Sequence, residues 1–145
     1  MAPTDMRSEY LAQSVLNATP ATLVTMLYDR LVLDIARAEQ AAAAGDRPAC
    51  HAAALHAQDV VSELLVSLDV NTWPDGQNLV TLYSHLSTEL VTANVQLDVA
   101  RLAGCRALVE PLRDAWHAAA QELSAEQAAP IRPAAVGPRG ELGVG

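Results

Sequence analysis

Residues 19–38 read TPATLVTMLYDRLVLDIARA, and this stretch decides the fold of the chain. Pro20 suits the first turn of a helix, where its missing N–H costs nothing, and the hydroxyl of Thr19 can cap the free backbone amides. Apolar residues then recur at steps of three and four, which predicts a long helix with one buried face that ends near Gly45. They are Val24, Leu27, Leu31, Ile35, Ala38 and Ala42.

More apolar side chains lie outside or at the edge of this stripe. They are Leu23, Met26, Tyr28, Val32 and Leu33. One core face does not account for so much apolar surface. The surplus indicates a protein that binds something.

The composition favours one helical domain. A chain of 145 residues is long enough for one domain with a proper core and too short for two. Hydrophobic residues make up 51% of the chain while aromatic residues make up only 3%, so good helix formers outweigh the typical strand formers.

The charge excludes several classes of partner. Seventeen acidic residues stand against nine basic ones, all of them scattered arginines, and the net charge is −8. Binding to nucleic acid requires clustered basic side chains that replace counterions on phosphate, so no nucleic-acid partner is expected.

The first ten residues lack the apolar core of a signal peptide, and no apolar run approaches the roughly 20 residues that span a bilayer. We therefore expect a cytoplasmic protein without membrane insertion.

The remaining segments predict three more helices. Turn-forming residues 45–48 precede a second helix at 48–70, the break at 71–76 precedes a third at 77–102, and Ala103-Gly104 precedes a fourth that ends at 123. Pro111 either delays the start of the fourth helix or kinks it. Short connections make neighbouring helices antiparallel, so the sequence predicts an all-α, antiparallel up-down four-helix bundle over residues 19–123.

Both ends of the chain are expected outside this bundle. Residues 6–18 form a short helical segment with Tyr10 and Val15, which is either a movable arm or an ordinary N-terminal helix that seals the core. Residues 1–18 are therefore treated as an N-terminal arm. Residues 124–145 are rich in proline and glycine, and we expect them to be a disordered tail.

The sequence contains no recognisable set of catalytic, cofactor-binding or metal-binding residues. It has no glycine-rich phosphate loop and no Glu-x-x-His pair. Cys50 and Cys105 are interpreted as buried thiols, and His85 with Glu89 as a surface contact. We expect neither enzymatic activity nor a cofactor or metal.

The third predicted helix has an unusual composition. Between Gln77 and Leu97 the only formally charged side chain is that of Glu89, whereas a solvated helix face of this length normally carries several charges. Exposed apolar grooves usually receive an amphipathic helix from a partner. Burial of the same surface in a homodimer explains the pattern equally well, and the residues leave both interpretations open.

Several short motifs occur in a familiar order. They are Tyr10 with Ser14-Val15, Ala18-Thr19-Pro20, Leu23, Met26-Leu27-Tyr28-Asp29, Leu90-Val91-x-Ala93-Asn94 and Arg113-Asp114-Ala115-Trp116. Together they resemble the FliS family of flagellar secretion chaperones over residues 8–123. The chain departs from the family pattern at Thr22, where a glutamate often completes a capping box, in the lack of basic residues in the third helix, and in its tail.

The resemblance implies a helical bundle that binds the C-terminal segment of flagellin, prevents its premature polymerisation and delivers it to the export gate. It leaves open an anti-sigma factor as a further client. The alternative interpretation is a self-associating structural bundle without an export role. A third interpretation is an enzyme whose active site the sequence does not reveal.

On this reading we assign expected roles to individual residues. Tyr10 and Val15 belong to an arm that covers the groove. Leu23, Leu27 and Tyr28 contribute apolar wall, and Asn94 and Asp98 offer polar contacts. Trp116 is interpreted primarily as a core residue.

Overall fold

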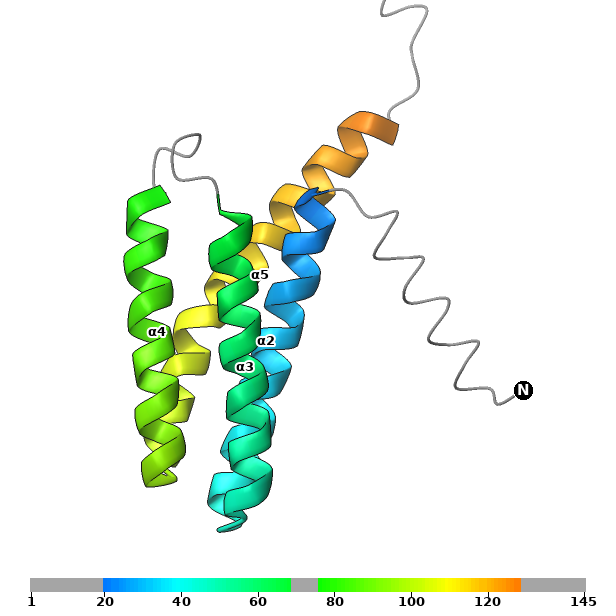
Figure 1. Cartoon of the computed structure of the whole chain (residues 1–145). Coiled ribbons are helices and arrows are strands. Elements are labelled where there is room, and N and C mark those ends of the chain that lie inside the picture. Colours follow the sequence, from blue (N-terminus) through cyan, green and yellow to red (C-terminus); the bar gives the residue numbers. More distant parts are fainter. Residues whose placement is uncertain (1–19, 69–75, 129–145) are drawn as a thin grey trace, which may run out of the picture.

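The computed structural model describes residues 20–68 and 76–128, which form four helices (Figure 1). These are α2 (Pro20–Ala43), α3 (Arg47–Ser67), α4 (Gly76–Gln96) and α5 (Val99–Ala128). The predicted arm with Tyr10 and Val15, and the tail beyond residue 128, lie outside the described residues.

The helices pack as a ring, in which α2 contacts α3 and α5, and α4 contacts the same two helices. Neighbours joined by short connections run in opposite directions, as Figure 1 shows for α2 and α3. No strand occurs within residues 20–68 and 76–128. The prediction of an all-α four-helix bundle is therefore confirmed.

The core is aliphatic and alanine-rich, and α2 supplies its largest share. Tyr28, Leu31, Ile35 and Ala38 of α2 are all 0% exposed. The other helices contribute one apolar stripe each. These stripes include Cys50, Ala57, Val61 and Leu64 of α3, Tyr83, Leu86 and Leu90 of α4, and Leu102, Cys105 and Val109 of α5.

Two turns of the same design connect α2 to α3 and α4 to α5. Each contains a residue in the left-handed region, Gly45 with φ 71° and Leu97 with φ 52°. An aspartate follows in both turns. Asp46 accepts a hydrogen bond from the backbone N–H of Ala49 at 3.1 Å, and Asp98 caps α5 in the same way at 3.0 Å. Each aspartate therefore satisfies one free amide at the start of the next helix.

The predicted position of the last connection is wrong. The sequence placed it at Ala103-Gly104, but α4 ends at Gln96, the turn is Leu97-Asp98, and Gly104 lies within α5. Leu97 continues the apolar row of α4, so the helical periodicity runs through the turn without interruption. A leucine also takes the left-handed conformation that usually requires glycine.

Helix α5 continues through Pro111 and ends at Ala128, beyond the predicted end at 123. Pro111 has no N–H to donate to the carbonyl of Ala107. Both residues are exposed, so water can hydrate that carbonyl. In Figure 1 the orange end of α5 extends past the start of α2.

Two glycine substitutions should have opposite effects on stability. A Cβ added at Gly45 or at Gly104 meets no atom within 4 Å, so only the backbone conformation distinguishes the two sites. Gly45→Ala should lower the free energy of unfolding by about 1 kcal/mol because its φ is positive. Gly104→Ala should raise it by up to about 1 kcal/mol because alanine favours a helix. Urea denaturation measures both, and a destabilised Gly104→Ala variant would place the turn at Gly104 after all.

Candidate partner-binding site

The three aromatic side chains of the described part of the chain meet at one end of the bundle. Tyr28 of α2 and Tyr83 of α4 are 0% and 3% exposed, and their hydroxyl oxygens are 2.5 Å apart in a shared hydrogen bond. Trp116 of α5 stacks on Tyr28 with ring centroids 6.4 Å apart and an interplanar angle of 23°. Trp116 is partly buried and packs against the core, in agreement with its interpretation as a core residue.

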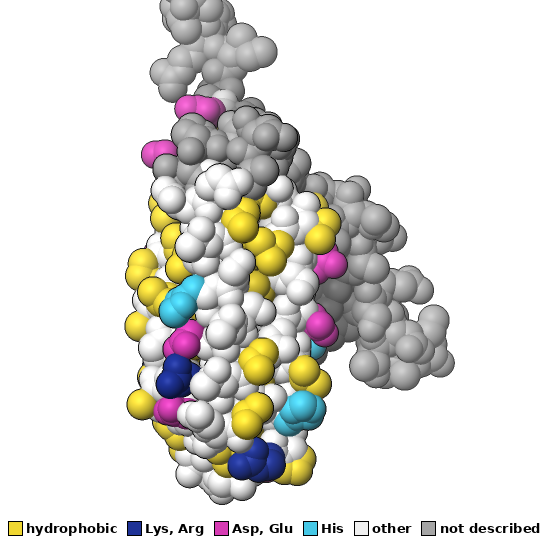
Figure 2. Space-filling view, turned by 60° about the vertical axis from the view of Figure 1, so that its left-hand side comes forward, with side chains coloured by type: hydrophobic (Ala, Val, Ile, Leu, Met, Phe, Trp, Pro, Cys, Tyr) yellow, Lys and Arg dark blue, Asp and Glu magenta, His cyan; other side chains and the backbone are white. Residues whose placement is uncertain are grey.

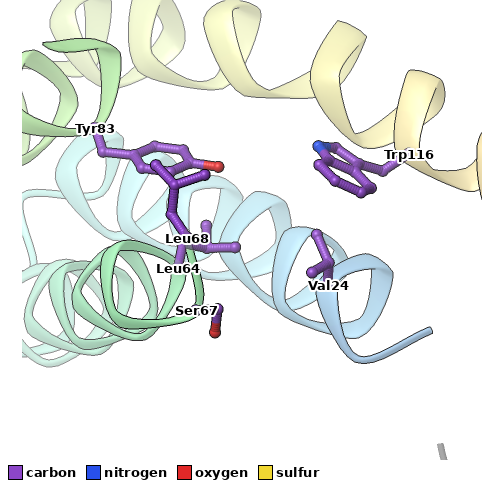
Figure 3. A pocket seen from close by; sticks show the side chains of 6 residues that line it. All are labelled: Val24, Leu64, Ser67, Leu68, Tyr83 and Trp116. Carbon is purple, nitrogen blue, oxygen red and sulfur yellow. The ribbon is translucent and has the colours of Figure 1, made fainter. Parts of the chain in front are cut away.

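This cluster borders a small apolar hollow with a volume of about 30 Å³. Figure 3 shows Trp116 and Tyr83 pointing toward one another from α5 and α4 across it. We call this hollow the end pocket. Its lining is Val24, Leu64, Ser67, Leu68, Tyr83 and Trp116. A concave, mostly apolar surface of this kind suits one apolar side chain of a partner.

The tyrosine hydroxyls remain protonated. Burial raises the pKa of Tyr28 far above its ordinary value of 10.0, the hydrogen bond and charge interaction with Tyr83 add to the rise, and a hydrogen bond with Trp116 opposes it. Burial also raises the pKa of Tyr83. A buried phenolate would lose its hydration, so these groups hold the helices together in neutral form and are poor acids or bases.

The outer face of α4 carries an uncharged row of side chains, which we call the α4 band. Its members repeat at steps of three and four and lie on the side of α4 away from the core. They are Gln77, Val80, Thr81, Ser84, Thr88, Val91 and Val95. In Figure 2, which brings the α4 side forward, uncharged surface runs down the middle and charged side chains lie mostly toward the margins.

The α4 band is more apolar than its sequence suggests. The hydroxyl of Thr81 donates to the carbonyl of Gln77 at 3.1 Å, and that of Thr88 donates to the carbonyl of Ser84 at 3.1 Å. Hydroxyls bonded to their own helix leave the threonine methyl groups to face outward. Val91 and Val95 are 47% and 65% exposed. The band therefore offers a methyl-rich surface.

A second hollow lies where α3 begins and α4 ends. Asn94 is 8% exposed, and its Nδ2 donates to Nδ1 of His51 at 2.9 Å. Arg47 donates to the carbonyl of Val95 at 3.0 Å. Pro48 completes the lining of this hollow, and Val95 also belongs to the α4 band. The side-chain carbonyl of Asn94 has no hydrogen bond within the described part of the chain, so it can accept one from a partner.

The predicted site residues lie in different parts of the bundle. Leu23 and Leu27 are half-buried on α2 on either side of Val24, which lines the end pocket. Tyr28 lies inside the bundle. Asn94 lies on α4, on the far side of the ring from α2.

Asp98 has a structural role in the turn between α4 and α5. It caps α5, and its Oδ2 lies 3.5 Å from Nε of Arg101.

The sequence did not predict the end pocket, because nothing in the spacing of Val24, Leu64 and Leu68 shows that they line one hollow. The small number of aromatic residues was the one available signal.

The thiols match the sequence interpretation. Cys50 and Cys105 are free and buried, and burial raises the pKa of Cys105 to about 11. Among the described residues, no group of three or more His, Cys, Asp or Glu side chains could hold a metal ion. The helices of the described ranges also lack the combination of length and hydrophobicity that crossing a membrane requires.

An all-α four-helix bundle with an end pocket and an uncharged band is the class of protein that the fold and the candidate site define. A family model described as flagellar protein FliS matches residues 3–123, and the chain belongs to this family.

Two curated relatives agree with the family model. The flagellar secretion chaperone FliS of Bacillus subtilis (strain 168) is 31% identical over 121 residues, which cover 83% of this chain and 90% of the relative. The flagellar secretion chaperone FliS of Escherichia coli (strain K12) is 30% identical over 105 residues, which cover 71% of this chain and 77% of the relative.

The hydrogen bond between the two tyrosines can be tested by a double-mutant cycle. Tyr83→Phe should lower the free energy of unfolding by about 1–2 kcal/mol because it removes the bonded partner of the Tyr28 hydroxyl. Tyr28→Phe in the Tyr83→Phe background should then cost less than it does alone, with a coupling of about 1 kcal/mol. Urea denaturation of all four proteins gives the coupling, and strictly additive losses would contradict a bond between the hydroxyls.

Proposed function

We propose that the protein is a cytoplasmic export chaperone that binds the C-terminal segment of flagellin. In this role it prevents premature polymerisation of flagellin and delivers it to the flagellar type III export apparatus. Membership of the FliS family and the names of both relatives support a role in flagellar secretion. The observation that carries the flagellin proposal is the α4 band, because an uncharged outer face on a chain of net charge −8 suits contact with another polypeptide.

The dimensions of the band suit a helical segment of the client. From Gln77 to Val95 the axis of α4 extends about 27 Å, which corresponds to a partner helix of about 18 residues. Apolar residues on one face of that helix would contact Val91, Val95 and the threonine methyl groups. Asn94 would accept a hydrogen bond from the client. A client that is disordered before binding loses conformational entropy, and burial along the band offsets this cost.

The end pocket supplies an anchor for a second part of the same client. Aromatic side chains in partly buried pockets contribute strongly to many protein interfaces, and Trp116 and Tyr83 line this pocket. Leu23 and Leu27 would extend its wall along α2. Because the pocket and the hollow at Asn94 lie on different parts of the bundle, a client that uses both has to wrap around it.

The first test is co-purification with flagellin. Full-length flagellin should be retained by the tagged protein, and flagellin that lacks its last ~40 residues, a few helical turns and a linker, should not be. Equal retention of both forms would refute binding through the C-terminal segment.

The second test is a charge placed on the α4 band. Val91→Glu should weaken binding of a C-terminal flagellin peptide about tenfold, or about 1.4 kcal/mol, because the carboxylate would lose hydration at the interface. The matched control is Leu108→Glu on α5, since Leu108 is 40% exposed and Val91 is 47% exposed. Calorimetry measures both affinities, and equal losses in the two variants would mean that the band is not the binding surface.

A self-associating structural bundle would use the same exposed valines. Light scattering of the purified protein without flagellin separates the two functions. A dimer at micromolar concentration that Val91→Glu converts to a monomer, together with no capture of flagellin, would favour the structural bundle.

A further inference from the structure

A separate hollow lies between α2 and α3, and its chemistry differs from that of the α4 band. Three alanines line its α3 side, and charged side chains of α2 line the other side. The lining residues are Arg30, Asp34, Arg37, Ala49, Ala52, Ala53 and His56. We call this hollow the α2–α3 groove.

Both oxygens of the only carboxylate that lines the groove already accept hydrogen bonds. Asp34 is 2% exposed, and its Oδ1 accepts from Nε of Arg30 at 3.1 Å while its Oδ2 accepts from Nδ1 of His56 at 2.5 Å. Nη2 of Arg30 lies 3.4 Å from Nε2 of His56. An arginine only donates, so Nε2 of His56 is the acceptor in this contact. Asp34 therefore has little capacity left for a further cation.

The arginines retain capacity to donate. Arg37 has no ion pair or hydrogen bond within residues 20–68 and 76–128, whereas each of the other arginines in these ranges has at least one. Nη1 of Arg30 is also free of bonds within these ranges. The groove thus presents two guanidinium groups and one carboxylate, a local excess of positive charge on a chain whose net charge is −8.

The spacing of these groups matches a helix. Arg30 and Arg37 are seven residues apart on α2, about 10.5 Å along its axis, which equals two turns of a neighbouring helix. The small alanine side chains of α3 allow a backbone to approach closely. Leu33 and Leu55 belong to the same two helices and are each 43% exposed, so apolar surface is available beside the charges.

We propose that the α2–α3 groove is a second docking surface, which takes an acidic amphipathic helix of another protein. Two carboxylates spaced two turns apart on that helix pair with Arg30 and Arg37, and small apolar residues between them pack on the alanines of α3. The charge complementarity selects an acidic partner over a basic one. This proposal uses a different pair of helices from the α4 band and does not depend on flagellin binding.

The test uses two synthetic 18-residue helical peptides with blocked ends and an alanine- and leucine-rich face. One has glutamates at positions 6 and 13, and the other has glutamines at the same positions. The glutamate peptide should bind at least about fivefold more tightly at low salt, and its advantage should shrink as salt is added. Fluorescence anisotropy measures both affinities. Equal affinity of the two peptides, or no binding of the glutamate peptide at about 1 mM, would overturn the proposal.

A charge reversal at Arg37 tests the direction of the pairing. Arg37→Glu should abolish the preference for the glutamate peptide, and a peptide with lysine at one of the two positions should bind this variant about fivefold more tightly than it binds the parent. Arg113→Gln is the control for a lost positive charge outside the groove, and it should leave all peptide affinities unchanged. Capture of flagellin by Arg37→Glu should match that of the parent protein. Unchanged peptide preference in Arg37→Glu, with circular dichroism showing a folded bundle, would overturn the proposal.

Discussion

The bundle depends on the polar side chains of α2, which form a bond to each of the other three helices. The pairs are Tyr28 with Tyr83 of α4, Asp34 with His56 of α3, and Glu39 with Arg106 of α5. A buried polar group that loses its partner costs roughly 1–3 kcal/mol, whereas apolar contacts tolerate sliding between helices. The apolar stripes therefore supply most of the driving force, and the polar pairs of α2 fix the register of each neighbour.

The position of the candidate site follows from this arrangement. Because α2 packs closely against α3 and α5, α4 closes the ring from the far side and buries only one stripe of its own. The opposite face of α4 does not pack on the other three described helices. Its lack of charge distinguishes it from the solvated faces of α2 and α3. The end pocket lies next to the point where the aromatic side chains of α2, α4 and α5 meet.

Local signals predicted much of this structure. Pro20, Gly45 and Asp46 mark helix boundaries by their own backbone chemistry, and the uncharged face of α4 is visible in the sequence because its missing charges do not depend on tertiary contacts. The sequence did not predict the turn at Leu97, because leucine has no preference for the left-handed backbone conformation. The burial of Tyr28 and the saturation of Asp34 could not be predicted either, since their partners Tyr83 and His56 lie on other helices.

The two proposed surfaces would respond to different conditions. Contact along the α4 band would rest on burial of methyl groups, which added salt does not screen. Contact in the α2–α3 groove would rest on partly exposed charges, whose attraction weakens over a Debye length of about 8 Å at physiological ionic strength. A chaperone with these two surfaces could hold its client tightly on the α4 band. A second partner could bind more weakly, and in a salt-dependent way, to the α2–α3 groove. Retention of a client and recognition by a second partner would then not compete for the same side chains.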